Sequence, residues 1–361
     1  MTEAPSRTPF TAETWDAYVR ANAHATYLQT SAWARVKAAT GWSAAHVGGQ
    51  GGGHGPLGAQ VLIRPIPVMP WTFAYAPRGP LADAWNAGTH DAWLELVRAA
   101  ANEGGPLDHA ALLRMDPEVE DAPEVRAALE GSGWRRAHDM QPRRTRIVDL
   151  AGDEPALWSG LRKKWRQYVN KARSNEVVVR DVDPAVEKDA FDTFHRVMRE
   201  VSQRTALPLR SSGAFRDVWE AFAPTGESRL LFAESKAHEV EAVLLLVRCG
   251  GTVVEPYGGM TGAGAESRAN YLLKWEAIRT SREMGATAYD MWGLIGTGID
   301  YFKEGFGGRE VSYVGAWDLP LSTVGARAFR TAERGRQLYR ASRRRLRGED
   351  LALPAAPGSE A

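Results

Sequence analysis

The chain has 361 residues, of which 44% are hydrophobic and 25% charged, a composition typical of a folded protein that excludes a disordered or collagen-like one. Its single cysteine, Cys249, excludes a disulfide framework and a cysteine-rich metal site. The length favours two domains. The sequence shows neither a signal peptide nor an apolar run of about 18 residues, so we expect a soluble, cytoplasmic protein.

Positive charge is concentrated in two segments, although the net charge of the whole chain is only +1. Residues 157–173 hold six basic and no acidic residues, and residues 327–347 hold nine basic and one acidic residue. Together the two segments carry a net charge of +14, so the rest of the chain is acidic. Such basic stripes favour a polyanionic partner, namely nucleic acid, an anionic membrane face or a phosphorylated substrate. Two solvated helix faces are the alternative.

The first elements in chain order are a short helix and a pair of strands. The run SAWARVK (31–37) predicts a helix with Trp33 and Lys37 on one face, because these residues are four positions apart. The run GGQGGGHGPLG (48–58) predicts a mobile hairpin tip. A phosphate-binding loop would lead directly into a helix, whereas a strand pattern follows here.

Two stretches of the chain share the order strand, strand, helix, strand. The elements of the first stretch are 59–64, a strand ending at Tyr75, a helix at 88–102 and a strand ending at Asp116. Those of the second are 242–248, a strand ending at Tyr257, a helix at 268–284 and a strand around Asp290. Each helix stops at glycine, the usual C-terminal signal. The repeat predicts a duplicated α/β domain.

The boundary between the two domains is expected near residues 141–149, where a polar arginine cluster meets a short strand. We expect a first domain at residues 1–145, completed by a C-terminal helix at 317–348 that lies outside the repeat. A second domain is expected at 146–316 and a disordered tail at 349–361. The second domain should begin with helices at 154–174, 184–203 and 213–222 and a strand at RLLFAES, which precede its copy of the repeat.

Motifs for covalent and metal-assisted catalysis are missing from the sequence. It contains no GxSxG, HExxH or GxxxxGK[ST] run, and its eight histidines lack metal-ligand spacing. What remains is a set of cations in aromatic or loop settings: Lys37, Arg204, Arg210 and Lys303. Cations at helix ends and loops suit contacts to a phosphate or to a developing oxyanion. For each of them a surface ion pair is the alternative.

Ten short runs, taken in order, resemble the FemABX peptidyltransferases, which build peptidoglycan interpeptide bridges by transferring an amino acid from aminoacyl-tRNA. These runs cover roughly residues 25–321 and are SAWARVK (31–37), FAYAPRGP (73–80), LLRMDPEV (112–119), QPRRTRIVDL (141–150), GLRKKWRQYVNKAR (160–173), PYGGM (256–260), SRANYLLKWEAI (267–278), YDMWG (289–293), FKEGFGG (302–308) and YVGAWDLPL (313–321). The ordered set carries the resemblance. It implies an α/β (α+β) fold of two tandem GNAT-like, acyl-CoA N-acyltransferase-like domains, each a mixed twisted sheet flanked by helices. The chain has no room for the coiled-coil arm of some members.

The resemblance also implies roles at the site. Lys303 would stabilise the tetrahedral intermediate, Tyr257 would line the site, and Asp116 would act as general base or only orient the acceptor amine. The residues expected to grip the diphosphate of a muramyl-peptide substrate, or to lie beside that grip, are Trp33, Lys37, Arg204 and Arg210. Ala111 and Ala214 stand where some members have tyrosine, which leaves recognition of the stem peptide open.

Aminoacyl-tRNA is the implied donor. Phe302 would stack on the terminal adenosine of this tRNA. The two basic stripes would contact either the tRNA phosphates or a membrane face, through Arg162, Lys163, Lys164, Arg343 and Arg344. No cofactor or metal is implied, because the ester of the donor is already activated.

We therefore expect an aminoacyltransferase of the EC 2.3.2 class. It would move a residue of the glycine, alanine or serine class to the side-chain amine of a lipid- or nucleotide-linked muramyl-pentapeptide. It would be a cytoplasmic monomer in peripheral contact with the inner membrane face. The alternatives are a tRNA-dependent peptide ligase of natural-product synthesis, an acyl-CoA-dependent N-acyltransferase and a tRNA- or membrane-binding module without activity. The run GMTGAGAES (259–267) is only loosely like a pyrophosphate-binding loop.

Overall fold

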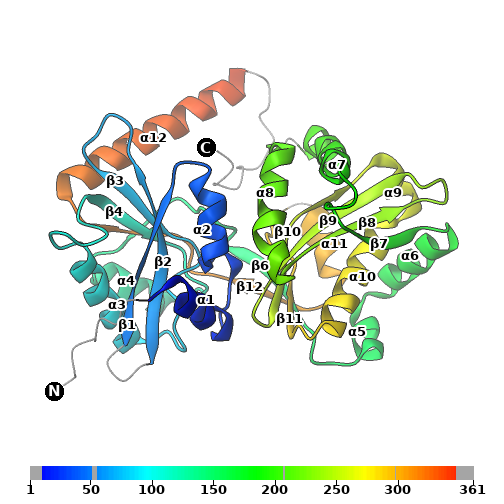
Figure 1. Cartoon of the computed structure of the whole chain (residues 1–361), viewed down its shortest axis with the longest axis horizontal. Helices are drawn as coiled ribbons and strands as arrows, with labels where there is room; N and C mark the ends of the chain where they lie inside the picture. The colour runs from blue at the N-terminus through cyan, green and yellow to red at the C-terminus, as the bar shows by residue number, and fades with distance from the viewer. Residues whose placement is uncertain (1–9, 51–54, 206–207, 297, 347–361) are drawn as a thin grey trace. The chain divides into compact units, whose positions relative to one another are not determined.

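A computed structural model describes residues 10–50, 55–205, 208–296 and 298–346 of the chain. The chain divides into two compact units (Figure 1). Unit 1 contains the described residues up to Arg143 and those from Ser312 onward, and unit 2 contains Arg144 to Val311. The expected tail at 349–361 lies outside the described residues.

Unit 1 is a six-stranded sheet with helices on its faces. Its helices are α1 (Ala12–Ala21), α2 (Ser31–Ala38), α3 (Ala87–Ala100), α4 (Pro123–Gly131) and α12 (Thr323–Leu346), with a 3-10 turn at Tyr27–Gln29. Its strands are β1 (Ser43–Gln50), β2 (Pro56–Pro65), β3 (Thr72–Ala76), β4 (Ala110–Met115), β5 (Arg135–Arg136) and β13 (Trp317–Pro320). The strand order is β1-β2-β3-β4-β13-β5, with β3 and β4 parallel and the other neighbours antiparallel.

Both faces of the unit 1 sheet are covered. Trp93 and Val97 of α3 belong to one apolar cluster with Val61 and Ala74 of the sheet. On the other face Phe73, the neighbour of Ala74 on β3, stacks on a ring of α12, with 4.8 Å between the ring centroids of Phe73 and Phe329. The C-terminal helix therefore docks on unit 1 in the described structure.

The expectation of a helix over 317–348 is wrong at its start. Residues Trp317–Pro320 form strand β13, which pairs with β4 and β5, and helix α12 begins only at Thr323. Alternation explains the difference, because Trp317 and Leu319 enter the apolar core while Asp318 points to the other face. There Asp318 lies opposite Arg114 and pairs with it at 2.7 Å (Nε to Oδ1).

Arg114 connects both C-terminal elements to strand β4. Its guanidinium also contacts Glu333 of α12, with 2.9 Å between Nη1 and Oε1. Arg114 and Asp318 are buried, and a buried cation needs such partners to offset its lost hydration. These contacts tie β13 and α12 to unit 1.

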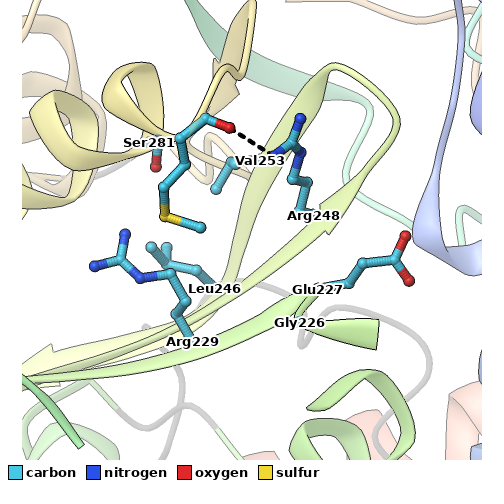
Figure 2. Close-up of a pocket in the computed structure, with 8 residues that line it drawn as sticks. Gly226, Glu227, Arg229, Leu246, Arg248, Val253 and Ser281 are labelled. Atoms are coloured by element: carbon cyan, nitrogen blue, oxygen red, sulfur yellow. Dashed lines mark hydrogen bonds between the residues drawn. The ribbon is translucent and has the colours of Figure 1, made fainter. Parts of the chain in front are cut away.

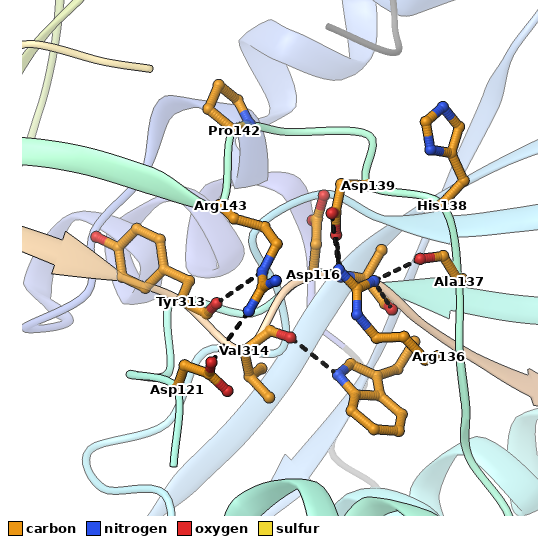
Figure 3. A network of polar contacts seen from close by, with 12 residues as sticks. Asp116, Asp121, Arg136, Ala137, His138, Asp139, Pro142, Arg143, Tyr313 and Val314 are labelled. Carbon is orange, nitrogen blue, oxygen red and sulfur yellow. Dashed lines mark hydrogen bonds and ion pairs between the residues drawn. The ribbon is translucent and has the colours of Figure 1, made fainter. Parts of the chain in front are cut away.

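The chain leaves and re-enters unit 1 through one polar network (Figure 3). Arg143, the last residue before unit 2, donates to the carbonyl of Tyr313 at 3.3 Å and to Asp121 at 3.0 Å. Nearby, Arg136 pairs with Asp139 at 2.5 Å, and the indole of Trp317 donates to the Val314 carbonyl at 3.2 Å. The two crossing segments are thus held side by side.

Unit 2 is a seven-stranded sheet with helices on both faces. Its helices are α5 (Glu154–Gly160), α6 (Lys163–Ser174), α7 (Ala190–Thr205), α8 (Ser212–Phe222), α9 (Gly262–Ser267), α10 (Ala269–Glu283) and α11 (Gly298–Glu304), with a 3-10 turn at Ala223–Thr225. Its strands are β6 (Arg144–Asp149), β7 (Val178–Val182), β8 (Ser228–Glu234), β9 (Val240–Cys249), β10 (Thr252–Met260), β11 (Ala288–Asp290) and β12 (Arg309–Ser312), which ends at the boundary between the units. The helix expected at 154–174 is two helices, because Leu161 and Arg162 are extended.

The sheet of unit 2 repeats the plan of unit 1. Its order is β12-β6-β11-β10-β9-β8-β7, and β10 and β11 are a parallel pair joined by α10, as β3 and β4 are joined by α3. Helices α6 and α10 cover the face of the sheet that carries Leu231 and Ala233. Helices α7 and α8 also pack on the sheet, α7 on β9 and β10 and α8 on β8 and β9. Burial on both faces explains the continuous apolar run of β9.

Candidate active site

A candidate site in unit 2 lies where the parallel strands β10 and β11 separate. Their pairing ends at Val254 opposite Asp290, and β10 bulges directly afterwards, between Val254 and Tyr257. The chain after β11 turns sharply, with positive φ at Trp292 (48°) and Gly293 (59°). The carboxyl ends of diverging parallel strands are the usual place for a ligand in α/β sheets.

Lys303, on helix α11, reaches into this turn. Its ammonium donates to the carbonyl oxygens of Trp292 and Gly293, the latter at 2.7 Å. Burial lowers the pKa of Lys303 to about 8, a decrease that Glu255 opposes and Lys274 reinforces. Lys303 is therefore a lysine that changes charge close to physiological pH, as is common at functional sites.

Phe302, the neighbour of Lys303, is part of an aromatic cluster. Its ring meets Tyr271 and Phe306 edge-on, with centroid distances of 5.0 and 5.2 Å, and it packs against the core of unit 2. Tyr271 in turn contacts Tyr168 of α6 at 4.8 Å. Phe302 is thus half-buried, and the more exposed ring of this region is Tyr301, which is 55% exposed.

A second group of expected residues gathers at the end of β10. The Arg210 guanidinium lies 5.2 Å from the ring centroid of Tyr257, which Phe215 meets edge-on at 5.1 Å. Arg204 donates to the carbonyl of Met260 at 2.5 Å. Burial raises the pKa of Tyr257, so its hydroxyl stays neutral and can donate a hydrogen bond.

The basic stripe of unit 2 begins beside Lys303. Arg162 pairs with Glu304 at 2.5 Å and lies 5.0 Å from the ring centroid of Tyr301. Lys164 lies 5.5 Å from the ring of Tyr168, and Lys163 is exposed. Arg343 and Arg344 belong to α12 in unit 1, but their side chains lie outside the described structure.

In unit 1, Lys37 and Trp33 share one face of α2, as their spacing predicts. The Lys37 ammonium lies 5.9 Å from the ring centroids of both Trp33 and Trp42, and Arg64 lies 4.6 Å from Trp42. Two cations against one pair of indoles form a site suited to an anion with apolar surroundings.

Asp116 follows strand β4 and is only 1% exposed. One carboxylate oxygen accepts from the Tyr75 hydroxyl at 2.8 Å and the other from the Arg78 backbone N–H at 2.7 Å. Burial raises the pKa of Asp116 to about 6, although Arg78 and both hydrogen bonds oppose the increase. This geometry anchors the loop after β3.

Sequence reasoning missed a buried ion pair in unit 2, between Lys274 of α10 and Glu255 of β10. The Tyr289 hydroxyl donates to the same carboxylate at 2.7 Å. The available signal was one lysine within the apolar run LLKW (272–275) and one glutamate within the run VVEPY (253–257). Neither charge belongs on such a face unless it has a buried partner.

Two hollows in unit 2 lie elsewhere. The pocket in Figure 2, between Leu246, Val253 and Met284, is partly closed by Arg248, which donates to the Met284 carbonyl at 2.7 Å. Its volume is about 10 Å³, room for about one water molecule. A larger polar recess contains a set of ion pairs, in which Arg180 contacts Glu187 and Glu234 at 2.6 and 2.7 Å. We assign a substrate to neither.

Two family models match the chain. Residues 10–122 match the FemAB family, and residues 159–304 match the acetyltransferase (GNAT) domain. Together with the two sheets, these matches confirm the expected α/β class with tandem GNAT-like domains. None of the described helices has the length and apolar character needed to cross a bilayer.

Among curated proteins, the chain is similar to the lipid II:glycine glycyltransferase of Staphylococcus aureus. It is 26% identical over 229 residues to the protein of strain MRSA252 and 25% identical to that of strain USA300. Each match covers 61% of this chain and 52% of the relative, so the chain spans about half the length of the curated relatives it matches.

Among solved structures, the crystal structure of FemX has a TM-score of 0.75 at 20% identity and covers 87% of this chain and 96% of that one. A conserved protein of unknown function from Bacteroides thetaiotaomicron VPI-5482 has a TM-score of 0.54 at 12% identity, covering 87% and 99%. These likenesses show the fold.

Proposed function

Because this chain belongs to the FemABX family, we propose that it is an aminoacyltransferase that extends peptidoglycan precursors. It transfers an amino acid of the glycine, alanine or serine class from aminoacyl-tRNA to the side-chain amine of a muramyl-pentapeptide. In this proposal it works as a monomer at the inner face of the membrane and needs no cofactor.

The observation that carries the proposal is the setting of Lys303. In the reaction the acceptor amine attacks the ester carbonyl, a C–N bond forms and the C–O bond to the ribose breaks. The amine's proton passes to the leaving ribose oxygen. Two of the three N–H bonds of the Lys303 ammonium point at the carbonyls of Trp292 and Gly293, and we assign the third to the developing oxyanion.

Aminoacyl-tRNA as donor is supported by the rings and cations around Lys303. The Arg162 guanidinium lies 5.0 Å from the ring centroid of Tyr301. The Arg268 guanidinium lies 4.7 Å from the ring centroid of Tyr168, which the Lys164 ammonium also contacts. Aromatic rings beside cations bind unpaired nucleotides, at about 1–3 kcal/mol per stacked base. Besides Phe302, we therefore propose Tyr301 as a ring for the unpaired end of the tRNA, because it is the more exposed of the two.

Two cations, one in each unit, are separate candidates for binding the acceptor's diphosphate, because each is held against aromatic rings. Lys37 lies between Trp33 and Trp42 in unit 1, and Arg210 lies over Tyr257 in unit 2. Arg204 is the secondary candidate. Asp116 acts in this proposal as a positioning residue, because its buried oxygens are already occupied by Tyr75 and Arg78.

The test offers the purified protein tRNA charged with labelled amino acids, together with lipid-linked and nucleotide-linked muramyl-pentapeptides. Mass spectrometry of the acceptors should show the gain of one amino acid residue, which would name donor and acceptor together. If tRNA binds and neither acceptor gains mass, the proposal fails and a peptide ligase of natural-product synthesis becomes the better hypothesis.

A further inference from the structure

A lysine and a glutamate are buried together below the candidate site. The side chains of Lys274 and Glu255 are 5% and 4% exposed, and the Lys274 ammonium donates to Glu255 Oε2. Tyr289 donates to the same oxygen. Their helix and strands supply the apolar core of unit 2, including Leu273 and Trp275, the residues on either side of Lys274.

Stability does not explain this pair. Removing two charges from water costs more than their attraction usually returns, and apolar residues of similar size often serve as well or better. The pair is also placed where the sheet opens, because Glu255 lies in the bulge of β10 just after the last residue paired with β11. A costly buried polar contact directly beside a site points to a role in that site.

The pair and Lys303 meet at the same end of β11. Tyr289 of β11 donates to Glu255, and Lys303 donates to the carbonyls of Trp292 and Gly293, which follow directly after β11. The charged groups that act on the Lys303 ammonium are Glu255 on β10, Lys274 on α10, Asp290 at the end of β11 and Asp300 on α11.

The two aspartates have other partners. Asp290 accepts from the Trp292 N–H at 2.7 Å and from the Thr145 hydroxyl. Asp300 accepts from the N–H groups of Ile295 and Gly296 at 2.8 and 2.9 Å and lies 3.6 Å from the Arg144 guanidinium. The remaining two groups, Lys274 and Glu255, are paired with each other. They act on Lys303 in opposite directions.

We propose that the Lys274–Glu255 pair is a positioning element that sets the charge state of Lys303. As a neutral unit, the pair keeps Glu255 from fixing Lys303 in its protonated form and keeps Lys274 from expelling the Lys303 proton. This inference rests on the proposed function for its importance, since the charge of Lys303 matters only if that amine meets the reacting ester.

Nuclear magnetic resonance can measure the charge of Lys303 without any assay of transfer. The chain has eight lysines, so a protein labelled at lysine Cε and Nζ gives few signals, and Lys303→Met identifies that of Lys303. In Lys274→Met the unpaired Glu255 should raise the Lys303 titration midpoint by about one pH unit. In Glu255→Gln the unpaired Lys274 should lower it by a similar amount.

Three further variants separate charge control from a structural role. Lys274→Arg keeps the positive charge and should restore the wild-type midpoint. The double variant Lys274→Met/Glu255→Leu removes both charges, which buried pairs tolerate, and its midpoint should lie between those of the single variants. Lys236→Met removes an exposed lysine, paired with Glu176, and should leave the midpoint unchanged.

Opposite shifts in the two single variants would support the inference. Equal midpoints in all variants that fold, the double variant included, would overturn it. The pH dependence of transfer then tests the proposed function separately. The titration midpoint of Lys303 can shift in a variant while the decrease of kcat at alkaline pH stays where it was. That result would refute the role of Lys303 in the reaction, but not the inference that the pair controls its charge.

Discussion

Replacing Lys303 by methionine tests the chemistry most directly. Methionine keeps an unbranched apolar stem but removes the ammonium that donates to Trp292 and Gly293 and, in our proposal, to the oxyanion. Loss of one donor to an oxyanion costs about 2.7–4 kcal/mol, so kcat should fall about 10²–10³-fold. The KM for aminoacyl-tRNA should change little, because this contact forms only in the transition state.

The dependence of the wild-type kcat on pH provides a second quantitative test of the role of Lys303. With the Lys303 pKa at about 8, the amine is about nine-tenths protonated one pH unit below that value and about one-tenth protonated one unit above it. The acceptor must attack as the neutral amine, so kcat is first divided at each pH by the fraction of neutral acceptor amine. Since protonated Lys303 is the donor, the corrected kcat should be level well below pH 8 and approach a tenfold fall per unit above it. The Lys303→Met variant should lack this limb.

The assay is single-turnover transfer of a labelled amino acid to the muramyl acceptor, corrected for spontaneous hydrolysis of the ester at each pH. Lys236→Met, an exposed lysine away from the site, is the control and should transfer at the wild-type rate. Full activity in Lys303→Met would refute the reasoning. So would a wild-type kcat that still rises through pH 8 after division by the fraction of neutral acceptor amine, which would mean that neutral Lys303 is the active form.

Three other predictions concern binding and stability. Lys37→Met should raise the KM for the muramyl acceptor about tenfold and leave that for aminoacyl-tRNA unchanged, measured by steady-state kinetics; equal effects on both would contradict the assignment. Arg114→Met should lower the free energy of unfolding by about 3–5 kcal/mol in urea titrations, because the buried Asp318 loses its near partner and keeps the more distant Arg330, at 4.0 Å; a loss below about 1 kcal/mol would contradict this. Gly305→Ala should lower the free energy of unfolding by about 1–3 kcal/mol, since its Cβ would collide with the Trp165 indole, whereas Gly298→Ala meets no atom within 4 Å and should be neutral; similar melting temperatures would refute the clash.

Local patterns in the sequence determined the elements and their order. The alternation and helical periodicity of the repeat identified the strands that became β2, β3, β9 and β10 and the crossover helices α3 and α10. Four-residue spacing placed Lys37 beside Trp33. Such features depend on contacts between residues close in the chain, which a sequence displays directly.

The tertiary structure alone decided where charges meet. Lys274 and Glu255 are 19 residues apart. Each charge within its apolar run indicates a buried partner, but only the fold shows that the two residues are partners of each other. Asp318 and Arg114 are 204 residues apart, and their pairing made a strand of residues expected to begin a helix. Lys303 was recognised from its neighbours in sequence, but its charge state depends on burial and on groups from β10, α10 and β11. Hydration lost on burial is a property of the assembled core, so no local pattern contains it.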